Sequence, residues 1–236
     1  MAVERFHFQV IIDNAHYLLV GNLAQGQIGG VLLTLLIALS SGLLALIIGF
    51  VLALLCRFFP RRLAPALGTL GELVRGIPLL LLIFWLYFLL PMLLGRGAPD
   101  TISVIAALAL FNAFSVMLTI LSGLAALPPG QNEAAMASGF THWQRLRWVL
   151  LPQALSHILP SLVNLFVALI KDTSLAFVVS VPELTLVSSQ INNREQIYPL
   201  EIFLTAGAIY FALCSSLTWA AHQLENRLAR RQLSIV

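Results

Sequence analysis

The chain has 236 residues and a formal net charge of +3; 59% of its residues are hydrophobic, only 10% are charged, and its mean hydropathy is +0.93. Soluble domains carry roughly 45–50% apolar and about 25% charged residues. The composition therefore excludes a disordered chain, a collagen and a nucleic-acid binder with a large basic face, and it argues against a soluble enzyme. A polytopic membrane protein is predicted. It is too small for a typical twelve-span carrier, so we expect it to work in an oligomer or a multi-subunit machine.

Five apolar runs are long enough to suggest membrane spans, each of which needs about 20 apolar residues. The fourth run is interrupted by Lys171 and Asp172. The segment before the first run has no clean apolar core or cleavage site, so no signal peptide is predicted, and residues 8–20 favour a short interfacial helix. The predicted spans are Ile28–Cys56, Ile77–Leu94, Ile102–Leu127, about Gln153–Val181, and Pro199–Ala221.

Arginines predict the orientation of these spans, because cytoplasmic connections of membrane proteins carry an excess of basic residues. Nine arginines fall on one side and three on the other. We therefore expect the C-terminus in the cytoplasm and the N-terminus outside. The domains predicted are an external segment 1–27, a membrane domain 28–225 with a cytoplasmic loop 128–152, and a cytoplasmic tail 226–236. The nine are Arg57, Arg61, Arg62, Arg75, Arg145, Arg147, Arg227, Arg230 and Arg231; the three are Arg5, Arg96 and Arg194.

Small residues recur along two of the predicted spans. Such stripes let helices approach closely in a membrane, and ordinary packing is the first interpretation. The alternative is that these helices move or line a path. The stripes are Ser41, Ala45, Gly49 and Ala53 in the first span, and Ala109, Ala113, Thr119 and Gly123 in the third.

The loop 128–152 is far longer than a tight connection between two helices requires. Pro128–Gly130 breaks the preceding helix, and Asn132 is expected to cap a short helix that ends at Gly139. Thr141 begins a capping-box pattern for a second short helix. Two short helices at an angle would form a rigid cytoplasmic knob suited to docking into a groove on a soluble partner.

In this loop, Glu133-Ala134-Ala135 is followed by Gly139 and, after nine more residues, by Val149-Leu150-Leu151-Pro152. This spacing resembles the coupling-loop signature of ABC importer permeases, with valine in place of the usual isoleucine. The resemblance implies that the loop docks on an ATP-hydrolysing subunit. The residues implied in this coupling are Glu133, Ala134, Ala135, Gly139, Arg145 and Pro152.

Further stretches are similar to the polar amino-acid branch of these permeases, which includes histidine, glutamine, glutamate and arginine types. They are Arg75–Leu80, Leu151–Leu155, Lys171–Ala176 and Val181–Leu184, while Trp85–Tyr87 and Thr141–Gln144 resemble glutamate/aspartate members.

The resemblance implies an all-α, five-span bundle of the type I importer (MetI-like) kind in the bacterial inner membrane, acting as one half of a pore for a polar amino acid. It also implies a second permease, identical or homologous, two cytoplasmic ATPase subunits that use ATP and Mg, and an external solute-binding protein. Membrane lipid is expected around the chain, and no nucleic-acid partner is expected.

The sequence departs from the family pattern near the end of the third span. Many relatives carry a glutamate and then an arginine, where this chain has Leu118 and Leu121, and Pro129 stands where a basic residue is usual. Any role of those polar groups in substrate binding or gating is therefore in doubt here. One interpretation is that a non-identical permease supplies them.

No motif for chemistry is found in the chain itself, so no catalytic residue, bound cofactor or metal site is predicted. A P-loop requires a lysine after a glycine-rich turn, and the single lysine, Lys171, follows Ala168-Leu169-Ile170. The five histidines lack a metal-ligand spacing, and no Gly-x-Ser-x-Gly elbow is present. ATP hydrolysis is therefore assigned to a partner.

Charged residues inside a membrane segment suggest function, and two interpretations of Lys171 and Asp172 stay open. In the first, they line a translocation pathway with Thr173 and Ser174, in the outer half of the membrane near a break in the span. In the second, they form a structural ion pair. An ion-coupled secondary carrier using Lys171 and Asp172 is the alternative function, and a membrane scaffold is a third; neither needs the loop 128–152.

Overall fold

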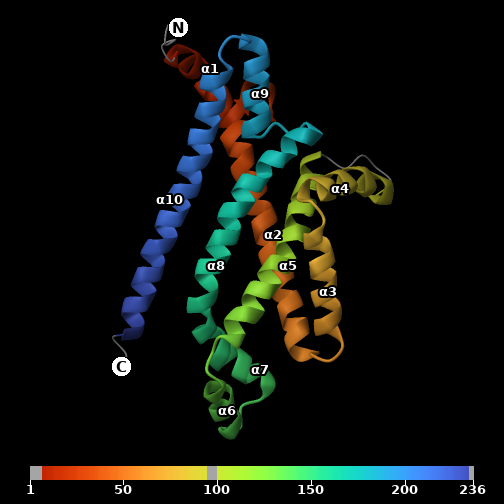
Figure 1. Cartoon of the computed structure of the whole chain (residues 1–236), viewed down its shortest axis with the longest axis vertical. Coiled ribbons are helices and arrows are strands. Elements are labelled where there is room, and N and C mark those ends of the chain that lie inside the picture. The colour runs from red at the N-terminus through yellow and green to blue at the C-terminus, as the bar shows by residue number, and fades with distance from the viewer. Residues whose placement is uncertain (1–6, 95–99, 234–236) are drawn as a thin grey trace. The chain divides into compact units, whose positions relative to one another are not determined.

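The chain is built almost entirely of helices (Figure 1). The computed structural model describes residues 7–94 and 100–233, so Arg5 and Arg96 of the predicted external side lie outside the described residues. The long helices are α2 (Gly30–Phe58), α5 (Asp100–Ala125), α8 (Leu151–Asp172) and α10 (Pro199–Leu233). The remaining elements are α1 (Phe8–Val20), β1 (Gly21–Asn22), η1 (Leu23–Gln25), β2 (Gln27–Ile28), α3 (Leu63–Gly76), α4 (Leu79–Leu94), α6 (Pro129–Ala137), α7 (His142–Gln144), η2 (Arg145–Leu150), η3 (Thr173–Val179) and α9 (Leu184–Glu195).

Four helical segments among the described residues are long and apolar enough to cross a membrane, and a fifth span results if the bent pair α3 and α4 is counted as one. The prediction of five spans agrees with the larger count. In that count the predicted second span, Ile77–Leu94, is too short, because it leaves out α3. The residues between the first and second predicted spans were expected to form a cytoplasmic connection, but most of them form the helix α3. Apolar residues spaced three and four apart give α3 a face that packs on the core, namely Ala64, Leu67, Gly71 and Val74.

The residue contacts divide the chain into two compact units. Unit 1 comprises Met1–Leu43, Ile77–Ala109 and Ala168–Ser215, and unit 2 comprises Leu44–Gly76, Leu110–Val167 and Ser216–Val236. The helices α2, α5, α8 and α10 contribute residues to both units.

In unit 1, α1 packs beside α9 (Figure 1). The helix covers the residues 8–20 predicted from the sequence. Leu18 is buried in a cluster with residues of α9 and α10, whereas Phe8 and Ile12 are exposed. An apolar, exposed face of this kind suits the boundary between water and lipid, so the placement of α1 in the interface stays a prediction.

The start of α2 is joined tightly to the segment before α9. Gly30 has a φ of +58°, and a Cβ atom there would lie 2.0 Å from the carbonyl oxygen of Leu18. The amide of Gly30 donates to the carbonyl of Pro182 at 2.9 Å, and the amide of Leu184 donates to the hydroxyl of Thr34 at 3.1 Å. Only glycine fits this position without strain, because an L side chain disfavours the left-handed backbone and here also meets a carbonyl.

Glu183 caps the amino end of α9 from a fully buried position. Its carboxylate accepts from the amides of Thr185 and Leu186 at 2.8 and 3.0 Å, and the hydroxyl of Tyr210 donates to it at 2.7 Å. Burial raises the pKa of this carboxyl group to about 7, although the hydrogen bonds oppose the shift.

Glycines allow close contact between helices in unit 2. A Cβ atom on Gly49 of α2 would lie 2.6 Å from the carbonyl oxygen of Ala113 on α5, and one on Gly123 would lie 2.3 Å from Ile158 on α8. The predicted stripe around Gly49 is therefore a packing surface, with Ala45 and Ala53 also buried. The buried cluster in this unit contains Ala53, Cys56, Phe114, Val116, Met117, Ile120, Ala154 and Ile158.

Replacing Gly49 by leucine should destabilise the chain, because the side chain would push α2 and α5 apart. Overpacking costs about 1–3 kcal/mol and occasionally more. The same substitution at Gly68 is the control, since nothing lies within 4 Å of a Cβ atom there. Melting temperatures in detergent should fall for Gly49→Leu and change little for Gly68→Leu; equal changes would contradict the close contact.

The buried carboxyl group of Glu183 should make stability depend on pH. Because its pKa is raised to about 7 from 4.5, the folded chain binds a proton in this range more readily than the unfolded chain. Its contribution to the free energy of unfolding should therefore fall as the pH rises from about 4.5 to about 7, by about 3 to 4 kcal/mol at about 1.4 kcal/mol per pKa unit. Melting at several pH values should show this decline in the wild type and in Glu133→Gln, an exposed control, but not in Glu183→Gln.

Candidate functional site: the coupling loop and a polar cavity

The first helix of the loop 128–152 is α6, and it begins earlier than predicted. Pro129 occupies its first position, and Pro128 precedes it without a side-chain cap. Asn132 therefore lies inside the helix, and its predicted capping role is wrong. Proline is favoured at this first position because its ring fixes a helical φ and its missing amide is not needed there.

The end of α6 is a Schellman motif centred on Gly139. The amide of Gly139 donates to the carbonyl of Met136 at 3.0 Å, and the amide of Phe140 donates to that of Ala135 at 3.2 Å. Gly139 has a φ of +78°, as expected for the residue that ends the helix in this way, but nothing lies within 4 Å of a Cβ atom there. The prediction that the short helix ends at Gly139 is confirmed, and glycine is required there for its backbone conformation rather than for lack of space.

The second helix starts at the predicted capping box. The amide of Gln144 donates to the hydroxyl of Thr141 at 3.4 Å, and the amide of Thr141 donates to the side chain of Gln144 at 2.8 Å. The helix does not end within the loop, however. It continues from α7 through the π-helical η2 into α8, so the helix that contains the fourth span begins near His142 rather than near Gln153.

Arg145 holds the two parts of the loop together. Its guanidinium donates to the side-chain oxygen of Asn132 on α6 at 3.2 Å and lies 2.9 Å from Nδ1 of His142. The other ring nitrogen of His142 lies 3.1 Å from the guanidinium of Arg57 at the end of α2. A neutral imidazole accepts at only one nitrogen, so only one of these two histidine contacts is a hydrogen bond in either tautomer.

The loop presents apolar side chains to its surroundings although it is firmly packed inside. Ala135 of the motif is buried together with Leu146 and Leu150, which fixes α6 against the second helix. Glu133, Ala134 and Pro152 are exposed, as a docking surface requires. Large exposed side chains also lie on the loop, namely Met136, Phe140, Trp143 and Trp148.

The four predicted pathway residues lie together where α8 ends. Lys171 is exposed in the last turn, and Asp172 is the last residue of the α-helix. Thr173 is buried with its hydroxyl donating to the carbonyl of Ile170 at 2.7 Å, and Ser174 follows in the 3-10 helix η3. The span changes conformation at this polar run, whereas Pro160 lies within α8 and does not end it.

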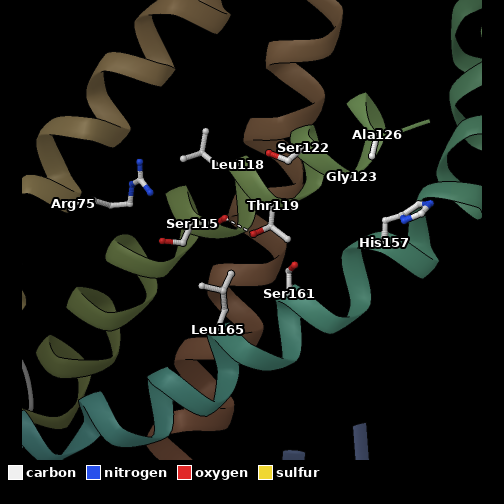
Figure 2. Close-up of a pocket in the computed structure, with 10 residues that line it drawn as sticks. All are labelled: Arg75, Ser115, Leu118, Thr119, Ser122, Gly123, Ala126, His157, Ser161 and Leu165. Carbon is white, nitrogen blue, oxygen red and sulfur yellow. Dashed lines mark hydrogen bonds between the residues drawn. The ribbon is translucent and has the colours of Figure 1, made fainter. Parts of the chain in front are cut away.

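A polar cavity of ≈ 450 Å³ lies among α3, α5 and α8 in unit 2 (Figure 2). Its size falls in the range of about 300–1,000 Å³ that is usual for small-molecule sites. None of the four residues Lys171 to Ser174 lines it. Its lining consists of Arg75, Ser115, Leu118, Thr119, Ser122, Gly123, Ala126, His157, Ser161 and Leu165.

Most of the polar residues of this cavity were missed from the sequence. Arg75 was assigned to a cytoplasmic loop, and the structure places it in the last turn of α3. A signal was present in the spacing: Ser115, Thr119 and Ser122 fall on one face of the apolar α5, and a similar pair, His157 and Ser161, falls on one face of α8. Polar side chains repeated every three or four residues inside a span indicate a face turned away from lipid.

Comparison with known families identifies the chain. Residues 45–230 match the model of the family described as "Binding-protein-dependent transport system inner membrane component". The chain belongs to this family. It is therefore a multi-pass inner-membrane component of a transport system, and the predictions that it is a membrane permease and not an enzyme are confirmed.

Curated and solved relatives of this family component cover most of its length. It is 38% identical over 200 residues, 84% of this chain and 91% of the relative, to the "Probable glutamine ABC transporter permease protein GlnP" of Bacillus subtilis. It is 29% identical to the "Glutamate/aspartate import permease protein GltK" of Escherichia coli, over 95% of this chain and 99% of the relative. The structure titled "Crystal structure of an amino acid ABC transporter with histidines" superposes with a TM-score of 0.81 and 26% identity, over 96% of this chain and 100% of that one. The predicted type I importer fold is confirmed.

Removing the side chain of Arg145 should loosen α6, because Arg145 is hydrogen-bonded to Asn132 across the loop. In Arg145→Ala, amides of α6 and of the Gly139 turn should exchange with solvent deuterium faster than in the wild type. Arg147→Ala is the matched control, since Arg147 is exposed and lies over the ring of its neighbour Trp148, at 5.3 Å. Equal exchange in both variants would contradict this role for Arg145.

Proposed function

We propose that the chain is the pore-forming permease of an ATP-driven ABC importer that brings a polar amino acid into the cytoplasm. The coupling loop is the observation that carries this proposal. Its motif Glu133-Ala134-Ala135 and Gly139 forms a firmly packed knob with exposed apolar side chains. Relatives similar over most of the chain are named as permeases for glutamine and for glutamate and aspartate.

The proposed assembly contains two permeases, identical or homologous, two cytoplasmic ATPase subunits and an external solute-binding protein. The knob would dock in a groove on an ATPase subunit, where Met136 and Phe140 lose their contact with water. The ATPase subunits, not this chain, would bind ATP and Mg. Dependence on a binding protein is part of the description of the family itself.

Transport in this proposal follows alternating access. Closure of the ATPase subunits on ATP moves the two knobs together, and the pore then opens to the outside. The cavity lined by Arg75, Thr119 and His157 is proposed as a point where the amino acid is held, because these groups match a carboxylate and an ammonium group. Lys171 and Asp172 with Thr173 and Ser174 are proposed as a second polar part of the pathway, in the outer half of the membrane.

An ion-coupled carrier is less well supported. Such a carrier needs no rigid cytoplasmic knob, and the family to which the chain belongs is defined by dependence on a binding protein. The charged pair at the end of α8 is also compatible with a structural role, because charges at helix ends are stabilised by the local dipole when their sign is suitable, as that of Lys171 is.

The decisive test reconstitutes the permease with its ATPase and solute-binding protein in proteoliposomes and measures ATP hydrolysis and amino-acid uptake together. Gly139→Arg should assemble but hydrolyse ATP without uptake, because a long charged side chain at a left-handed position disturbs the docking knob. Gly139→Asn is the control, since asparagine tolerates this conformation. It should retain at least about half of the uptake.

Two outcomes would contradict the proposal. Normal uptake by Gly139→Arg would remove this loop from the coupling. Uptake of a polar amino acid by the permease alone, driven by an ion gradient and without ATP, would establish the carrier instead.

A further inference from the structure

The polar cavity of unit 2 is unbalanced in charge. Arg75 is the one permanently charged side chain among its ten lining residues, and none of the ten is aspartate or glutamate. Glu72 lies one turn earlier on α3; its side chain is exposed, as is that of Arg75, but Glu72 does not line the cavity. The position where a carboxylate could have balanced Arg75 from α5 is occupied by Leu118.

We infer that this cavity selects its amino acid by charge: it favours an acidic amino acid, admits a neutral polar one less well, and rejects lysine and arginine. The inference rests on the proposed function of the chain as an amino-acid permease. It goes further because it assigns a substrate class to this chain from its own side chains.

The guanidinium of Arg75 is suited to hold a carboxylate. Its Nε donates to the carbonyl of Gly71 one turn earlier, at 3.4 Å, which directs the side chain along α3. The two terminal amino groups of the guanidinium then offer a fork of donors that matches the two oxygens of a carboxylate.

The other side of the cavity supplies uncharged polar groups. The hydroxyl of Thr119 donates to the carbonyl of Ser115 at 2.9 Å, so its oxygen can accept from an ammonium group. Ser161 and His157 on α8 lie across from α5 (Figure 2). A hydroxyl and an imidazole can bind either a second carboxylate or a side-chain amide. The cavity is therefore expected to bind an acidic amino acid most tightly and a neutral polar one less tightly.

A cationic side chain finds no matching group in this cavity. Its charge would enter the same space as the guanidinium of Arg75, and the two like charges would repel. Leu118 adds an apolar surface that gives the cation no hydrogen bond. Rejection of the wrong substrate by an unpaired charge is an effective route to specificity.

The test measures equilibrium binding of radiolabelled L-glutamate, L-glutamine and L-arginine to the purified complex of permease and ATPase. The external solute-binding protein is omitted because it makes its own selection. The wild type should bind L-glutamate most tightly and L-arginine about tenfold more weakly or worse. Leu118→Glu should reverse this preference and gain L-arginine binding by about tenfold, whereas the size-matched Leu118→Gln should keep the wild-type order. ATP hydrolysis by each complex shows that the variant has assembled.

Arg75→Gln provides a second, independent variant. It should lose most of the preference for L-glutamate over L-glutamine, since the charge that distinguishes them is removed. Equal binding of L-arginine and L-glutamate by the wild type, no gain of L-arginine binding in Leu118→Glu, or no binding of any of the three would each overturn charge selection at this cavity. None of these results would overturn the proposed function if the complete importer still couples ATP hydrolysis to uptake.

Discussion

The close approach of α2 to α5 at Gly49 is the constraint on which the architecture of unit 2 depends. Lipid gives apolar helices no hydrophobic reason to associate, so packing must come from surfaces that fit at short range. With no side chain at Gly49, the backbone of Ala113 and the side chain of Val116 come near enough for dense contact. The absence of a side chain at Gly123 likewise lets Ile158 of α8 pack closely against α5. Once α5 is held between its neighbours, its polar face must turn toward α3 and α8, and the cavity follows.

The interior of the loop 128–152 is rigid, whereas its outer surface is exposed to solvent. Its interior is fixed by local bonds, namely the Schellman turn at Gly139, the capping box at Thr141 and the guanidinium of Arg145. Its outer surface keeps apolar side chains exposed. A surface that is already organised loses little conformational entropy when it binds, so more of its contact energy remains for association. This arrangement suits a contact that must transmit movement in both directions.

The sequence predicted those features that are determined locally. The turn at Gly139 and the capping box at Thr141 depend on a few adjacent residues, and both were found where expected. The cap at Asn132 was wrong because proline at position 129 starts the helix one turn earlier, a competing local signal. The role of Arg75 was not predictable from its neighbourhood. It depends on α3 being a packed helix rather than a loop and on which faces of α5 and α8 meet it, and both are decided by tertiary contacts.

The π-helical turn Arg145–Leu150 has a mechanical consequence for the cavity. It lies on the same continuous helix as His157 and Ser161, between them and Thr141 at the base of the knob. A π turn accommodates one residue more than an α turn, and successive α-helical residues are rotated by about 100° about the axis. An α-helical turn in its place would rotate the following segment by about that angle, and His157 and Ser161 would then face away from the cavity wall. The extra residue accommodated by the π turn therefore sets which side chains of α8 line the site.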